Sequence, residues 1–267
     1  MTKKILALFG IAVALLLPSC LEFETKVTLN KDGSGTITEE IIFGQQMIGM
    51  LDMAAAQGGE NPLAQMKDKD AAQKKATAYG KGVTFVKAED IKTKAGGKGV
   101  RLTYNFKDIN EVTLNPSGDM ITLGNMQQGQ DLEEYPAVEE KASFRYNNGR
   151  LTIKLPVPEE EEVEVPEEGA LNPDDPEAAM MAEMLKGMKM SVKIVAADGI
   201  SETTATYHEN GTVTLLEMDM DMVMKNPGGL NALGKLQGKK PDELGKALKD
   251  IKGVKAETKK EVVVILK

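Results

Sequence analysis

Apolar and polar residues alternate one by one along much of this chain, and a period of two is typical of a strand with one buried face. The first such stretch begins at Leu21 and ends at Leu29. Turn-forming residues fill positions 30–35, and the alternation then resumes as far as Phe43. The pattern therefore predicts a β-hairpin at this point of the chain.

The same alternation recurs later, and turn-forming residues join several of the stretches. Glycines crowd positions 95–99, and Asn-Gly pairs at 148–149 and 210–211 suit the left-handed backbone of a tight turn. We therefore expect a sheet built largely from hairpins. Beyond the first hairpin, the predicted strands lie at 83–85, 100–106, 112–114 paired with 120–123, 144–146, 151–155, 190–194, 200–207, 213–218 and 254–266.

Elsewhere the apolar spacing becomes that of a helix. Over 44–57, Met47, Met50, Leu51 and Ala54 fall on one helical face. The other predicted helices lie at 61–78, which opens with an asparagine cap and a proline, and at 177–189, 230–236 and 241–251. Strands outnumber helices without a strict βαβ order. We therefore predict an α+β fold: a mostly antiparallel sheet built from hairpins, with several helices packed on it.

Residues 157–176 interrupt these patterns, because they are rich in glutamate and proline and carry little that could be buried. We interpret this segment as an acidic linker or insertion. The predicted signal peptide occupies 1–19. The linker then separates an α+β lobe at 20–156 from a second α+β lobe at 177–267. The pattern leaves open whether the lobes are distinct or form one continuous domain.

The first twenty residues differ from everything that follows. A basic start with Lys3 and Lys4 precedes the unbroken apolar run 5–17, and Ser19 precedes Cys20. A basic start, an apolar run too short to span a bilayer and a small residue at the end are typical of an export signal. We predict cleavage between Ser19 and Cys20 and lipidation of Cys20, the only cysteine in the chain. The alternative is an ordinary secretory signal with a coincidental cysteine.

Charge limits the partners of the exported part. Because Lys3 and Lys4 lie in the predicted signal, residues 21–267 hold 31 basic and 41 acidic side chains, a net charge of −10. Such a surface has no electrostatic reason to bind nucleic acid or to adhere to anionic lipid headgroups. The predicted membrane attachment is through acyl chains, such as palmitate, on Cys20. Leu21 in place of an aspartate after the cysteine favours the outer membrane of a Gram-negative cell, with the body facing the periplasm.

Short turn and strand-edge motifs stand along the exported chain. They are Asp32-Gly33-Ser34-Gly35, Gly82-Val83-Thr84-Phe85, and the runs at 104–110, 210–219 and 251–258. Together with the signal ending in Cys20, they resemble those of a group of uncharacterised bacterial envelope lipoproteins. More distantly, the early hairpin and the later strands are similar to LppM-like lipoprotein domains, for which lipid binding has been proposed. The resemblance implies a lipid anchor and the α+β class, and it implies no catalytic residues.

Few residues could support catalysis. His208 is the only histidine, and Cys20 is assigned to lipidation. A catalytic triad or a two-histidine metal site therefore cannot form within one chain. We predict a non-enzymatic protein and expect neither a cofactor nor a metal.

Methionine is unusually frequent between 180 and 224. Methionines occupy every second position from Met218 to Met224, which predicts a strand with a methionine-lined face packed on the 177–189 helix. Methionine suits either core packing or a pliable groove for an acyl chain or apolar peptide, and thioethers also bind Cu(I). The candidate ligand groove comprises Met180, Met184, Met188, Met218, Met220 and Met222.

The sequence thus predicts a lipid-anchored envelope protein with a binding or structural role, whose partner is another envelope protein or a lipid. The first alternative is a lipid or acyl-chain binding protein that uses the methionine-lined groove. It predicts an apolar cavity between the 177–189 helix and the strands at 190–224. The second alternative is a Cu(I)-binding protein that uses the same sulfur atoms.

Overall fold

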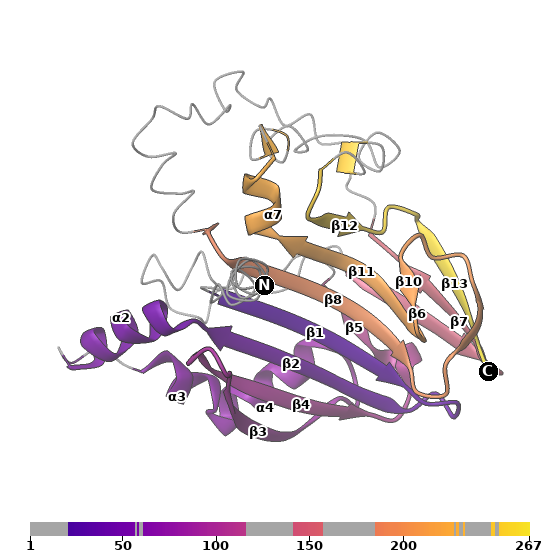
Figure 1. Ribbon diagram of the computed structural model, residues 1–267. Coiled ribbons are helices and arrows are strands. Elements are labelled where there is room, and N and C mark those ends of the chain that lie inside the picture. Colours follow the sequence, from indigo (N-terminus) through magenta and orange to yellow (C-terminus); the bar gives the residue numbers. More distant parts are fainter. Residues whose placement is uncertain are drawn as a thin grey trace, which may run out of the picture.

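The computed structural model (Figure 1) describes residues 21–56, 58, 61–115, 141–156, 185–226, 228–229, 232, 247–248 and 251–267. These residues form a large and a small β-sheet. Among the described strands, every pair is antiparallel except β1 with β8, and the helices are few. The fold is therefore α+β with antiparallel-dominated sheets, in agreement with the predicted class.

The large sheet is centred on β1 (Leu21–Leu29), which forms the predicted hairpin with β2 (Gly35–Phe43). On its other side β1 pairs in parallel with β8 (Met188–Ala196), a pairing that the sequence pattern did not predict. The strand order is β10-β11-β8-β1-β2-β4-β3, and β12 also pairs with β11. The remaining strands are β3 (Thr84–Lys92), β4 (Lys98–Phe106), β10 (His208–Glu209), β11 (Thr212–Asp219) and β12 (Val254–Ala256).

The small sheet has the order β5-β6-β7-β13-β9. Its predicted hairpin, β6 with β7, turns at Asn148 and Gly149, whose φ angles of 47° and 79° lie in the left-handed region. β5 pairs with β6, whereas its predicted partner at 120–123 lies outside the described residues. The strands are β5 (Thr113–Leu114), β6 (Ala142–Asn147), β7 (Arg150–Lys154), β9 (Ile200–Thr203) and β13 (Glu261–Leu266).

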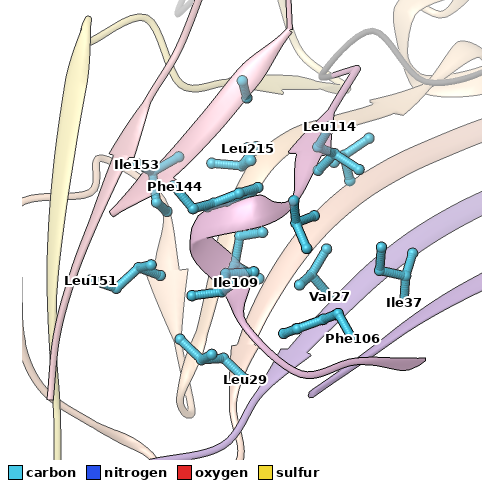
Figure 2. Packing of buried hydrophobic residues seen from close by; sticks show 14 of the residues in the cluster. Val27, Leu29, Ile37, Phe106, Ile109, Leu114, Phe144, Leu151, Ile153 and Leu215 are labelled. Atoms are coloured by element: carbon cyan, nitrogen blue, oxygen red, sulfur yellow. The ribbon is translucent and has the colours of Figure 1, made fainter. Parts of the chain in front are cut away.

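The main core lies where the two sheets face each other (Figure 2). Leu29, Ile37 and Phe106 project from the large sheet towards Leu151 and other side chains of the small sheet, all of them buried. Ile109, in the short 3-10 helix Ile109–Glu111, fills the space between them and is 1% exposed. Alternation in each strand supplies this apolar face, and its burial is the main stabilising term of the fold.

Both sheets draw strands from both sides of the predicted linker. In the large sheet, β1–β4 come before residue 157, and β8 and β11 come after residue 176. In the small sheet, β5–β7 come from the first stretch, and β9 and β13 come from the second. The segments at 20–156 and 177–267 are therefore hydrogen-bonded to each other along whole strands.

The helices differ in detail from the prediction. α2 (Gln45–Ala56) forms as expected, but Ile48 is its buried residue, and Met50 is 54% exposed. The predicted helix at 61–78 is two helices, α3 (Pro62–Met66) and α4 (Lys69–Ala78), because the Asp68 carboxylate accepts the Ala71 N–H and caps a new helix. No helix in the described part of the chain is long and apolar enough to cross a membrane.

Two more predicted boundaries change. The strand expected at 254–266 is two strands in different sheets, because the Glu257 carboxylate accepts hydrogen bonds from the Thr258 and Lys259 N–H groups and turns the chain between them. β8 begins at Met188, inside the helix expected at 177–189. The linker at 157–176, the predicted signal at 1–19, Cys20 and most of the helices expected at 177–189, 230–236 and 241–251 lie outside the described residues.

Candidate functional site

The predicted lipidation site immediately precedes, in the sequence, the central strand of the large sheet. Ser19 and Cys20 are outside the described residues, but Leu21 is the first residue of β1 and only 7% exposed. Leu21 is level with Phe43 on one side and with Met188 on the other, and Phe43 is level with Lys98. We call this row the Leu21 edge of the large sheet. Position 20 is therefore one peptide bond from a buried, doubly paired strand.

Only four of the six methionines of the candidate groove are among the described residues. Met180 and Met184 lie outside the described residues. Met188 and Met218 are half-buried against an apolar cluster that contains Met220, which is 2% exposed. Met222, by contrast, is 49% exposed and lies outside this cluster. The structure thus brings together Met188, Met218 and Met220.

Met220 and Met222 diverge because the predicted strand ends earlier than expected. The Asp219 carboxylate accepts the Met222 N–H at 3.1 Å and caps α7 (Met220–Met224), so the strand predicted to continue to Met224 is wrong. Residues two apart share a face in a strand but lie about 200° apart around a helix. One of the two methionines therefore enters the core, and the other faces outward.

Asp219 and Asp221, which lie beside these methionines in the sequence, accept hydrogen bonds from backbone N–H groups. Asp221 accepts the Gly187 N–H at 2.8 Å, and Asp219 adds to its capping role an ion pair with Lys189 at 3.5 Å. Among the residues that the structure describes, no three His, Cys, Asp or Glu side chains gather as a metal site would require. The single histidine, His208, is exposed in the short strand β10. These polar residues have roles in capping, pairing and solvation.

A buried carboxylate on β2 forms the most elaborate polar cluster. Glu39 is 3% exposed, because its side chain points to the core side of the large sheet. Its Oε1 accepts a hydrogen bond from the Tyr79 hydroxyl and lies 2.8 Å from Lys75 Nζ, and its Oε2 lies 3.3 Å from the Tyr104 hydroxyl. The rings of Tyr79 and Tyr104 pack at 5.4 Å between centroids. The cluster thus joins α4 to the centre of the sheet.

The alternating pattern of β2 indicates a buried Glu39, although the sequence analysis did not identify this residue. Ile37, Glu39 and Ile41 alternate with Thr38 and Glu40, so the period of two assigns Glu39 to the apolar face. A charged residue on such a face needs partners, because burying an unpaired charge is costly. The partners themselves stand about 40 and 65 residues later. Only the folded chain identifies them.

Space beside the buried carboxylate is small. A hollow of about 10 Å3 lies next to Glu39, with Thr25, Ile41 and Val192 also on its wall. That volume holds about one water molecule. The residues that line the hollow are in β1, β2 and β8, and Met188, Met218 and Met220 are not among them.

The opposite face of the large sheet carries ion pairs between strands. Glu24 accepts hydrogen bonds from Lys193 at 2.6 Å and Ser191 at 3.2 Å, across the parallel pair. Burial alone would raise the pKa of the Glu24 carboxyl, but Lys193, together with Lys26 and Ser191, outweighs burial and lowers the pKa below its usual value. These contacts link the two segments of the chain on the surface.

Comparison with known proteins leaves the function open. No protein-family model matches the chain, and no curated protein matches it. A weak structural neighbour is the folded domain of the LppM protein of Mycobacterium tuberculosis, solved by NMR, with a TM-score of 0.30 and 10% sequence identity. The match covers 76% of this chain and 85% of that domain. The function therefore has to be argued from this chain's own residues.

Proposed function

We propose that this chain is a lipoprotein of a bacterial cell envelope, anchored through acyl chains on Cys20 and facing the periplasm, on the outer membrane in a Gram-negative cell. Its α+β body has a non-enzymatic binding role, with another envelope protein or a lipid as the partner. The predicted signal at 1–19 and the single cysteine at its end are the sequence basis of the proposal.

One observation carries the proposal: the export-signal pattern is followed directly by a buried central strand. Leu21 pairs with both neighbours of β1, so the fold begins immediately after Cys20. A lipid on Cys20 therefore has no flexible tether, and the body sits against the bilayer. This geometry suits a protein that works at the membrane surface.

The polar cluster around Glu39 is compatible with a structural role. Both carboxylate oxygens have donors within the fold, from Tyr79 and Lys75 on one side and from Tyr104 on the other. The adjacent hollow holds about one water molecule. This arrangement supports the non-enzymatic proposal, since the carboxylate is used to hold α4 on the sheet.

Intact-mass measurement of the detergent-extracted protein tests the anchor. We expect a chain that begins at Cys20 and carries a thioether-linked diacylglyceryl group, because the thiol is the acceptor of the lipid. The Cys20→Ser variant has no thiol, so it should lack this mass. A wild-type chain that begins elsewhere, or that keeps a free thiol, would contradict the proposal.

Native mass spectrometry of a soluble version that begins at Leu21 separates the binding alternatives. Extra mass equal to a phospholipid would favour an acyl-chain binder, and a copper adduct would favour a Cu(I) site. Met188→Leu and Met218→Leu variants should weaken either adduct if the methionine cluster is the site. A bare mass leaves an envelope protein as the partner.

A further inference from the structure

Two helices leave the large sheet at the Leu21 edge. α2 starts two residues after Phe43, which is level with Leu21, and α7 starts directly after Asp219, which is level with Lys189. Figure 1 shows α2 continuing from the arrowhead of β2 and α7 continuing from that of β11, at the end of the sheet where β1 begins. Both helices thus lie at the end of the body to which Cys20 is attached.

These helices carry most of the exposed large apolar side chains. The described residues expose four such side chains: Met50 at 54%, Met53 at 62%, Val86 at 47% and Met222 at 49%. Met50 and Met53 are in α2, and Met222 is in α7. Val86 alone lies elsewhere, in the edge strand β3. Three of these four exposed apolar side chains are therefore in the two helices at one end of the large sheet, and exposed apolar groups that gather in one region indicate an interaction surface.

α2 is rich in apolar residues and contains one charged residue, Asp52. Its inner side packs Ile48, Met47 and Leu51 on the cluster that contains Leu21. Its outer side carries Met50 and Met53, together with the exposed Asp52, whose carboxylate forms an ion pair with Lys98 at 3.7 Å. A surface helix normally opposes its apolar side with a charged one, so exposed methionines beside only one charged residue indicate a further apolar neighbour.

Lysines border this apolar end. Lys92, Lys94 and Lys98 come from the β3–β4 hairpin, whose turn lies at the Leu21 edge, and Lys189 follows Met188 in β8. All four are exposed, and two of them also form ion pairs at this end, Lys98 with Asp52 at 3.7 Å and Lys189 with Asp219 at 3.5 Å. Lysines at a membrane interface place their methylene stems along apolar groups and their ammonium groups among phosphates. The border thus fits phospholipid headgroups, although the exported chain as a whole is acidic.

From this arrangement we infer that the Leu21 edge rests on the phospholipid surface, with Met50, Met53 and Met222 inserted between the headgroups. The inference rests on the proposed lipid anchor at Cys20, which would hold this end against the bilayer. It goes further, because it assigns a second contact and a fixed orientation: the Leu21 edge faces the lipid, and the hairpin turn at 30–34 faces away. Interfacial helices lie in this way, with their apolar side about 5–10 Å into the headgroup and acyl boundary.

Tryptophan fluorescence tests the orientation cleanly, because the chain contains no tryptophan. Full-length lipidated Met50→Trp, Met53→Trp and Met222→Trp variants would each be reconstituted into phosphatidylcholine vesicles with or without bromine on the acyl chains. Each should lose roughly half or more of its fluorescence on the brominated vesicles, since bromine quenches only at short range and the inserted depth is about 5–10 Å.

Val86→Trp is the matched control, because Val86 is equally exposed and lies beside Lys87, which pairs with Thr103, five residues along β4 from the Leu21 edge at Lys98. That separation is about 17 Å at roughly 3.3 Å per residue, so this variant should keep its fluorescence. Equal quenching in all four variants, or in none, would overturn the inferred orientation. The intact mass of each preparation separates the two proposals. A lipid on Cys20 without quenching refutes only the orientation, whereas an absent lipid refutes the anchor.

Discussion

Glu39 and Glu40 show how strand geometry decides the role of a residue. The two are chemically identical neighbours, but successive side chains of a strand point to opposite faces. Glu39 is buried with Lys75 and two tyrosines, whereas Glu40 forms an ion pair at 2.7 Å with Arg101 on the outer face. The Arg101 side chain is 43% exposed, so water screens that pair.

Alanine substitution should therefore separate the two glutamates. We expect Glu39→Ala to lower the free energy of unfolding by about 2–4 kcal/mol, because it leaves buried donors without an acceptor. Glu40→Ala should cost about 1 kcal/mol or less, as an exposed pair does. Urea unfolding of the soluble version that begins at Leu21 measures both. Equal losses of unfolding free energy in the two variants would show that the polar cluster around Glu39 does not stabilise the fold more than an exposed ion pair does.

Glu24 makes a pH-dependent contribution to stability. Its pKa is lower in the folded state than the usual value of 4.5, since the positive charge and hydrogen bond of Lys193 outweigh burial. A lowered pKa means that the folded state favours the carboxylate. The stabilisation is therefore complete above the unfolded pKa and is lost as the pH falls through the folded pKa.

The Glu24→Gln variant tests this linkage. At pH 7 we expect it to be less stable than the wild type by about 0.5–1 kcal/mol, the usual range for a partly exposed pair. As the pH falls below about 4, the two urea midpoints should converge, because both chains then carry a neutral side chain at position 24. A difference that stays constant down to pH 2 would exclude the ion pair as its cause.

At the scale of elements, hairpins follow closely from the sequence. A hairpin needs only an alternating pattern and turn-forming residues that are adjacent in sequence. In the first turn, the Asp32 carboxylate accepts the Ser34 N–H at 2.9 Å and the Ser34 hydroxyl at 2.6 Å, so the turn is built from its own residues. The β1–β2, β3–β4 and β6–β7 hairpins were all predicted correctly for this reason.

Element boundaries set by single carboxylates were predicted less well. Asp68 begins α4, Asp219 begins α7, and Glu257 separates β12 from β13. In each case one side chain accepts a backbone N–H and redirects the chain, whereas the apolar periodicity on either side continues as if nothing changed. The sequence predicts that the methionine-lined strand continues to Met224, because the period of two continues past Asp219 although Asp219 caps a helix there.

At the scale of the whole molecule, the parallel pairing of β1 with β8 determines the architecture. Val27 is level with Ile194, and the two strands are separated by more than 150 residues of sequence. This pairing, with those of β13 in the small sheet, places the two segments in the same sheets. We therefore expect the body to behave as one cooperative unit.

Cooperative unfolding is measurable in the soluble version. Far-ultraviolet circular dichroism reports on both sheets. Tyrosine fluorescence reports on Tyr79, Tyr104, Tyr135 and Tyr146 in the first segment and on Tyr207 in the second. The two signals should change together in a single urea transition, and Val27→Ala should shift both midpoints equally, because Val27 is fully buried in the shared core. Two separate transitions would indicate independent lobes.

Local sequence patterns are sufficient to predict the hairpins and the α+β class, and they are the basis for predicting an export signal that ends at a single cysteine. Each of these depends on residues close together in the chain, such as Asn148 and Gly149 in one turn or Ser19 and Cys20 in one signal. Local periodicity, turn chemistry and composition are sufficient there.

Three features become visible only in the folded chain: β1 pairs with β8, Glu39 contacts Lys75 and Tyr104, and Met220 is buried whereas Met222 is exposed. These features depend on contacts between distant residues or on one cap that changes a strand into a helix. A periodic pattern assigns a residue to a face but does not state what that face will meet. Packing of the whole chain selects the neighbours. Burial stabilises contact with any apolar partner, and hydrogen-bonding geometry then selects among the possible partners.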